Sequence, residues 1–145
     1  MSINETLIQT TYKHLKLRVL GGTYKYVLFT DSESLWKAVE AIKSCGNPSL
    51  LFVFDAEEDK SLVVKESAQV SGVKEQRTWK AFRVVGDMPF GTVQGLLATI
   101  SGTLKTNGIG VCVVSSYLTD FFLVLEKEFE RGVTALKQDG WEFVG

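Results

Sequence analysis

The sequence predicts an α+β fold with antiparallel sheets. Of its 145 residues, 45% are hydrophobic and 23% charged, and only 2 are proline, which is typical of globular rather than disordered chains. Segments whose apolar residues recur every three or four positions alternate with short runs of β-branched and aromatic residues. Because short polar turns join several of these runs, we expect the strands to pair as hairpins. The length suits one compact domain, or two very small ones that share a core.

The order of elements is clearest after residue 76. Residues 79–85 alternate as a half-buried strand does, and the glycine-containing segment 86–91 ends that strand. A helix is predicted from residue 92 to the Asn107-Gly108 pair, which favours a left-handed helix end. Its apolar face consists of Val93, Leu96, Leu97, Ile100 and Leu104.

A hairpin, a helix and a short strand complete the second half. Residues 109–117 and 121–125 are apolar runs separated by a few polar residues, which predicts a hairpin. Residues 126–139 have acids in the first turn, a lysine near the end and a glycine after it, as the helix dipole favours. Residues 141–144 predict the last strand. The order β-α-β-β-α-β is that of the ferredoxin-like fold.

The first half of the chain is less regular. Its pattern predicts a β-β-α-β-β order, with strands at 15–20, 24–29, 50–54 and 61–65 and a helix at 32–43. The Gly21-Gly22 pair predicts a hairpin turn between the first two strands, and an acidic turn at 55–59 joins the last two.

Two arrangements account for this irregular half. It is either a decayed copy of the second half, or the two ferredoxin-like halves exchange strands, so that each sheet is completed by the other. We favour exchange, because a lone half of this size buries too small a core. The expected division is an N-terminal extension at 1–14, a first half at 15–75 and a second half at 76–145, with a linker at 68–76.

Composition argues against several kinds of function. The net charge is −1 and the pI near 5.9, so we expect no nucleic-acid or membrane-surface partner. His14, Cys45 and Cys112 do not have the spacing of a zinc site, so neither a metal nor another cofactor is expected. The sequence shows no secretory signal and no membrane-length apolar run, which predicts a cytoplasmic protein with reduced cysteines.

Several segments together carry a resemblance to a known family. They are EQRTWKAFRVVG at 75–86, PF at 89–90, GLLATI at 95–100, NGI at 107–109 and SSYLTDFFLV at 115–124. These segments resemble the small tandem ACT-domain proteins of bacteria, which are related to the CASTOR arginine sensors. In the first half, the likeness rests on residues 20–24 and on the strand-turn-strand around Asp55.

The resemblance implies a regulatory module without catalysis. ACT domains are βαββαβ units that associate side by side and bind amino acids or similar molecules, so a homodimer with an amino-acid effector is expected. The implied effector site lies where the loop 87–94 meets residues 115–120. Its ligand-binding residues are Gly91, Thr92, Val93, Gln94, Ser115, Ser116, Tyr117 and Asp120.

The same resemblance implies a role for each part of this site. Asp120 is expected to pair with a ligand ammonium or guanidinium group, and Tyr117 to pack against the aliphatic part of the ligand. The backbone N–H groups of residues 91–94, at the start of a helix, are expected to bind the ligand carboxylate. Leu118 departs from the polar residue that the family carries at that position. Read locally, the same segment is also a plain hairpin turn in which the aspartate caps its own backbone.

Two other functions fit less well. For an enzyme, Ser115 and Ser116 are candidate nucleophiles, but the one imidazole of the chain, His14, has no recognisable catalytic partner. RNA-binding RRM domains share the βαββαβ order, yet residues 121–125 lack basic neighbours and are followed by Glu126.

A protein-interaction module is the alternative that the sequence leaves open. Such a module dimerises through its sheets and has no small-molecule ligand. Trp36, Trp79 and Trp141 are candidates for its interface, although a position in the core is the more usual role of tryptophan.

Overall fold

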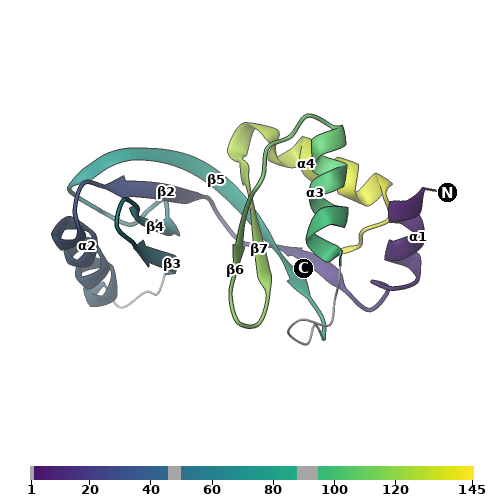
Figure 1. The fold of residues 1–145 in the computed structure, drawn as a ribbon, viewed down its shortest axis with the longest axis horizontal. Coiled ribbons are helices and arrows are strands. Elements are labelled where there is room, and N and C mark those ends of the chain that lie inside the picture. Colours follow the sequence, from purple (N-terminus) through teal and green to yellow (C-terminus); the bar gives the residue numbers. More distant parts are fainter. Residues whose placement is uncertain (1, 46–49, 88–94) are drawn as a thin grey trace. The chain divides into compact units, whose positions relative to one another are not determined.

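The computed structural model describes residues 2–45, 50–87 and 95–145, and it divides into two compact units. Unit 1 consists of Met1–Gly21 and Lys80–Gly145, and unit 2 of Gly22–Trp79. The elements along the chain (Figure 1) are α1 (Ile3–Gln9), β1 (Lys16–Val19), β2 (Tyr24–Phe29), α2 (Ser32–Ser44), β3 (Leu50–Asp55), β4 (Lys60–Lys65), β5 (Val73–Val85), α3 (Leu96–Thr106), β6 (Cys112–Ser115), β7 (Asp120–Leu125), α4 (Glu126–Gln138) and β8 (Phe143–Val144).

The sheet of unit 1 has the strand order β8-β1-β5-β7-β6. The strand β1 pairs antiparallel with the second part of β5, where Leu17 lies opposite Val84. On its other side β1 pairs parallel with β8, where Leu17 lies opposite Phe143. A strand from the first half of the chain therefore lies inside the sheet of the second half, which confirms strand exchange.

The sheet of unit 2 has the order β3-β4-β2-β5 and is antiparallel throughout. Its outer strand is the first part of β5, in which Gln76 lies opposite Val27 of β2. The 13-residue strand β5 thus supplies one strand to each unit. This α+β architecture of ferredoxin-like sheets is the fold class that the sequence predicts.

The structure differs from the predicted fold in four details. The hairpin predicted around Gly21-Gly22 is wrong, because β1 and β2 each pair with β5 and not with each other. The predicted linker at 68–76 is too long, since β5 begins at Val73. One sheet is mixed rather than antiparallel, because β1 and β8 run parallel. The helix α1, which Ser2 caps through the N–H of Glu5 at 3.1 Å, was not predicted.

The core of unit 1 joins its sheet to its three helices. Leu17, Phe82 and Phe122 are each 1% exposed or less, and the rings of Phe82 and Phe122 stack with centroids 5.0 Å apart. Tyr12, which follows α1, stacks on Trp141 at 6.0 Å, so the N-terminal segment belongs to this core. Each fully buried side chain of this size contributes about 1.5–3 kcal/mol to folding.

The core of unit 2 lies between α2 and one face of its sheet. The helix begins at the cap residue Asp31, which accepts from the N–H of Ser34 at 2.8 Å. Its buried stripe is Leu35, Ala38, Val39 and Ile42, at the spacing of one helix face, and it packs against Val27, Phe29, Leu62 and Val64.

The carboxylate of Asp55 joins α2 to the β3–β4 hairpin. Its Oδ2 accepts from the indole N–H of Trp36 at 2.7 Å, and its Oδ1 accepts from the hydroxyl of Ser32 at 2.8 Å. The ammonium of Lys60 lies 2.9 Å from Oδ1. These donors, led by Trp36, lower the pKa of Asp55 to about 2. Trp36 is therefore a surface residue with a bonded indole, whereas Trp141 is a core residue.

Candidate functional site

The turn of the β6–β7 hairpin contains the described part of the predicted site. Ser115 is the last residue of β6 and pairs with Asp120, the first residue of β7. Between them, the backbone N–H of Ser116 donates to the carbonyl of Thr119 at 2.8 Å. The N–H of Thr119 in turn donates to the hydroxyl of Ser116 at 3.2 Å. Ser116 is therefore held by the turn itself, as hydroxyl residues commonly are in turns.

The carboxylate of Asp120 is held across the hairpin. The hydroxyl of Ser115 donates to its Oδ1 at 2.6 Å. Among the described residues, Oδ2 of the same carboxylate has no hydrogen-bond partner. Asp120 thus bonds a side chain of the opposite strand rather than its own backbone, and one of its oxygens is available to a further donor.

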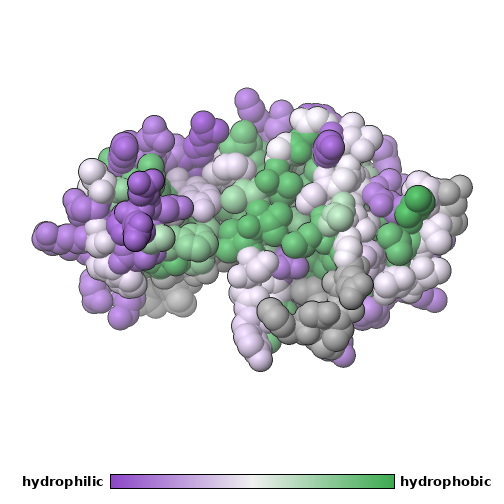
Figure 2. All heavy atoms as spheres, in the orientation of Figure 1, coloured by the Kyte–Doolittle hydropathy of each residue, from purple (hydrophilic) through white to green (hydrophobic). Residues whose placement is uncertain are grey.

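Two large side chains project from the tip of this turn. Tyr117 is 85% exposed and Leu118 is 78% exposed. Figure 2 shows apolar side chains gathered over β6 and β7, whereas the turn that joins these strands is coloured near white. Tyr117 and Leu118 are therefore surface residues of the turn and not part of the core of unit 1.

Thr119 anchors the turn to the neighbouring strand. This residue is only 6% exposed, and its hydroxyl donates to the carbonyl of Val84, near the end of β5, at 2.7 Å. The contact fixes the turn beside the strand end that leads into the loop predicted to hold the ligand. The sequence did not predict this contact, because Thr119 and Val84 are 35 positions apart and no local pattern connects them.

The end of β5 is itself fixed by a close backbone contact. Gly86 has φ +130°, and a Cβ at this position would lie 2.8 Å from the backbone oxygen of His14. The imidazole Nε2 of His14 lies 3.0 Å from the carbonyl oxygen of Asp87, the next residue. Only glycine allows this approach, so the first residues of the loop are positioned by the segment between α1 and β1.

The helix α3 begins at Leu96, directly after the cap residue Gly95. Gly95 has φ +74°, supplies no side-chain cap, and is followed by a first turn without acidic residues. A helix N-terminus whose first turn carries no acidic residue is favourable for an anion. The predicted carboxylate-binding residues Gly91, Thr92, Val93 and Gln94 lie outside the described residues.

The candidate nucleophiles Ser115 and Ser116 have hydrogen-bond partners within the turn, and the imidazole of His14 bonds elsewhere. The ring of His14 bonds a backbone carbonyl, while Ser115 bonds Asp120 and Ser116 bonds Thr119. Burial raises the pKa of the Cys112 thiol, which disfavours the reactive thiolate. Within residues 2–45, 50–87 and 95–145, no cluster of three potential metal ligands is present. In the same residues, no helix is both long and apolar enough to span a bilayer.

Part of the chain matches a known protein family, and the whole fold is similar to several solved structures. The family model described as ACT domain matches residues 74–138. No curated protein matches the chain. Several solved structures share its fold. A protein from Agobacterium tumefaciens is 24% identical, with a TM-score of 0.70 over 90% of this chain and 92% of its own.

Two further structures show the same fold at lower identity. A Vibrio cholerae protein of unknown function, described as a possible transport protein, is 19% identical, with a TM-score of 0.68 over 93% of this chain and 94% of its own. The regulatory subunit of aspartate kinase from Thermus flavus is 12% identical, with a TM-score of 0.58 over 87% of this chain and 96% of its own. The ACT-domain model thus matches the segment that begins in β5 and ends with α4, and the solved structures share the fold of the chain.

Proposed function

We propose that the chain is a regulatory protein that binds an amino acid at the β6–β7 turn. In this proposal Asp120 pairs with a cationic group of the ligand, Tyr117 covers its aliphatic part, and the loop before α3 binds its carboxylate through residues 91–94. Ser115 and Ser116 hold the turn in its binding shape.

The observation that carries the proposal is the state of the Asp120 carboxylate. One oxygen is fixed by Ser115 at 2.6 Å, so the group is oriented before any ligand arrives. The other oxygen lacks a partner among the described residues. A preoriented carboxylate beside an exposed tyrosine suits an ammonium or guanidinium group attached to an apolar stem. The match of residues 74–138 to the ACT-domain model supports an amino acid as that ligand.

The two units support a tandem arrangement of ACT-like halves. In unit 1 the strands β5, β7 and β6 lie in that order, and a helix connects β5 to β6. In unit 2 the strands β2, β4 and β3 repeat this order, and a helix connects β2 to β3. Both units thus place their first strand beside their third. The division at residues 75 and 76, and the relation to the CASTOR arginine sensors, are part of this proposal.

The proposed regulator acts without a catalytic step, in the cytoplasm, as a homodimer. The hydroxyls of Ser115 and Ser116 bond residues of the turn rather than a general base, which supports a binding role. Among the described strands, β6 pairs only with β7 and β3 only with β4, so each unit has an open sheet edge. Open edges are templates for pairing with a second chain.

A thermal-shift screen against the standard amino acids tests the proposal. A ligand that binds only the folded chain raises its melting temperature by mass action. Calorimetry with the best ligand then compares the wild type with Asp120→Asn. Losing one charge-assisted contact costs about 1.5–3 kcal/mol, so affinity should fall tenfold or more. The unliganded melt should stay nearly unchanged, because an asparagine oxygen still accepts from Ser115.

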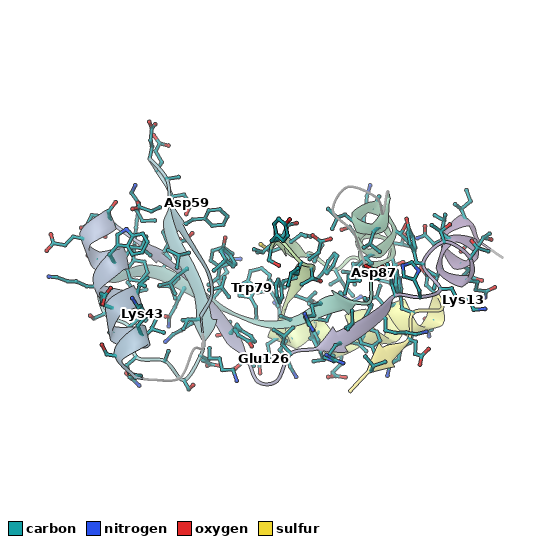
Figure 3. All side chains as sticks on the ribbon, turned by 90° about the horizontal axis from the view of Figure 1, so that it is seen from below. Lys13, Lys43, Asp59, Trp79, Asp87 and Glu126 are labelled. Carbon is teal, nitrogen blue, oxygen red and sulfur yellow. The ribbon has the colours of Figure 1, made fainter. Side chains whose placement is uncertain are left out.

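A matched control is Asp59→Asn, which removes the same charge from the exposed turn between β3 and β4 (Figure 3). This variant should bind the ligand as the wild type does. If Asp120→Asn binds equally well, or if no amino acid binds at millimolar concentration, the proposal fails. The exposed side chains Tyr117 and Leu118 then favour the alternative, a protein-interaction module without a small-molecule ligand.

A further inference from the structure

One face of the sheet in unit 2 has no helix on it. The helix α2 covers the face that carries Val27 and Phe29, and it is the one helix among the described residues of this unit. The opposite face carries aromatic rings that pack edge to face: Tyr26 on Phe52 at 5.5 Å, and Phe52 on Phe54 at 5.1 Å. Phe54 is 46% exposed. This is an aromatic platform that the fold of unit 2 leaves accessible.

Beside the platform lies a hollow of about 600 Å³. All of its lining residues belong to unit 2: Tyr26, Leu28, Glu75, Gln76, Arg77 and Trp79. The volume falls in the range of about 300–1,000 Å³ that is usual for small-molecule sites. The lining combines apolar surface from β2 with charged groups from β5. It therefore suits a ligand that has an apolar part and charged groups.

The two charges in the hollow have opposite sign and lie on alternate residues of one strand. Glu75 lies opposite Leu28 and Arg77 opposite Tyr26, so both project from the same face of the sheet. Both are exposed, and within the described part of the chain neither forms an ion pair or a side-chain hydrogen bond. Alternate residues on a strand are about 6–7 Å apart, which leaves room for a ligand to bridge them.

Trp79 adds a hydrogen-bond donor to this arrangement. It lies two residues beyond Arg77 on the same strand, and Figure 3 labels its side chain. Its indole Nε1 is buried and has no hydrogen-bond partner among the described residues. A buried N–H without an acceptor is unfavourable, so an oxygen atom of a ligand at this position relieves that cost. Arg77 and Trp79 both line the hollow, so the guanidinium and the indole N–H are the candidate donors to a ligand carboxylate.

We propose that this hollow is a second ligand site, which binds a small zwitterion with an apolar body. The carboxylate of the ligand pairs with the guanidinium of Arg77 and accepts from Trp79, while its ammonium pairs with Glu75. Its apolar part lies on Tyr26 and Leu28. Free apolar amino acids and short peptides share this chemistry. The lining residues of this site belong to unit 2, whereas the β6–β7 turn belongs to unit 1, and the proposal does not depend on ligand binding at that turn.

Calorimetry on the full chain tests the site with four probes. L-phenylalanine and the dipeptide L-leucyl-L-phenylalanine are zwitterions of two sizes. N-acetyl-L-phenylalanine lacks the ammonium, and L-phenylalanine amide lacks the carboxylate. At least one zwitterion should bind, and each truncated probe should bind tenfold or more weakly than its parent. Tighter binding of the dipeptide identifies peptides as the source, and tighter binding of the amino acid identifies free amino acids.

Single substitutions locate the site on the chain. Arg77→Gln and Glu75→Gln should each weaken the zwitterion tenfold or more, and Trp79→Phe, which keeps an aromatic ring but removes the N–H, should weaken it several-fold. The control Lys74→Gln removes a charge from the neighbouring exposed residue of β5 and should change affinity less than twofold. Asp120→Asn should also leave this binding unchanged.

Three results would overturn the second site. These are the absence of binding by either zwitterion at millimolar concentration, equal binding of the acetylated probe, and unaltered binding by Arg77→Gln. Glu75 and Arg77 are exposed, so their variants should fold, and circular dichroism of each variant checks this.

Discussion

Replacing Gly86 with alanine tests the close contact that fixes the end of β5. At φ +130° an L-residue is strained, at a cost of about 1–3 kcal/mol. The new Cβ would also lie 2.8 Å from the backbone oxygen of His14, so the two backbone segments must separate. Overpacking of this kind costs about a further 1–3 kcal/mol. We therefore expect Gly86→Ala to lower the free energy of unfolding by about 2–6 kcal/mol.

Substitutions at two other glycines separate the cost of backbone strain from the cost of the steric contact. Gly108 has φ +70° with nothing within 4 Å of an added Cβ, so Gly108→Ala carries the backbone strain alone, about 1–2 kcal/mol. Gly110 has neither a positive φ nor a near neighbour, so Gly110→Ala should be neutral or stabilising by about 0.4–1 kcal/mol.

Urea denaturation followed by circular dichroism measures all three variants against the wild type. The expected order of destabilisation is Gly86→Ala, then Gly108→Ala, then Gly110→Ala. A Gly86→Ala variant no less stable than Gly108→Ala would show that the approach of His14 to the end of β5 does not exist in solution.

Three further predictions concern acid stability, strand exchange and assembly. Because the folded pKa of Asp55 is about 2, below its usual 3.8, its stabilisation is complete above pH 3.8 and lost as pH falls toward 2. Acid titration of Asp55→Asn should lack this component, and an unchanged acid profile would contradict it. A fragment of residues 76–145 lacks β1 and should be poorly soluble or partly unfolded, whereas a cooperative monomeric melt would argue against exchange. Light scattering should return the mass of a dimer, and a single-chain mass at all concentrations would contradict assembly.

Sequence patterns predicted the elements that local periodicity defines. The helices α2, α3 and α4 have apolar stripes at helix spacing, and the β6–β7 hairpin has two apolar runs around a polar turn. The order of elements along the second half followed from these patterns. Its exchange with the first half was inferred only from the small size of a lone half, because nothing local specifies it.

Features that depend on long-range pairing were not accessible in this way. The position of β1 between β5 and β8 joins three distant segments, so the local signal of Gly21-Gly22 suggested a hairpin that does not form. The contact of Thr119 with Val84 likewise connects residues 35 positions apart. The hollow beside Trp79 exists only once the register of β2 and β5 sets which of their residues share a face.

The candidate site was likewise predicted in part, from its local pattern but not from its cross-strand contacts. The polar residues at 115–120 stood out in the sequence because they interrupt two apolar strands, and the structure gathers them in one turn. The bond between Ser115 and Asp120 follows from their being a cross-strand pair, which the sequence alone did not specify.

The central claim, that an amino acid binds at the β6–β7 turn, is tested most directly by two-dimensional ¹H–¹⁵N NMR of the labelled chain. Spectra are recorded during titration with the best ligand from the thermal-shift screen. The account predicts that the largest shifts belong to the backbone amides of residues 115–120 and of the first turn of α3. Shifts confined to other residues, or none at saturating ligand, would contradict it.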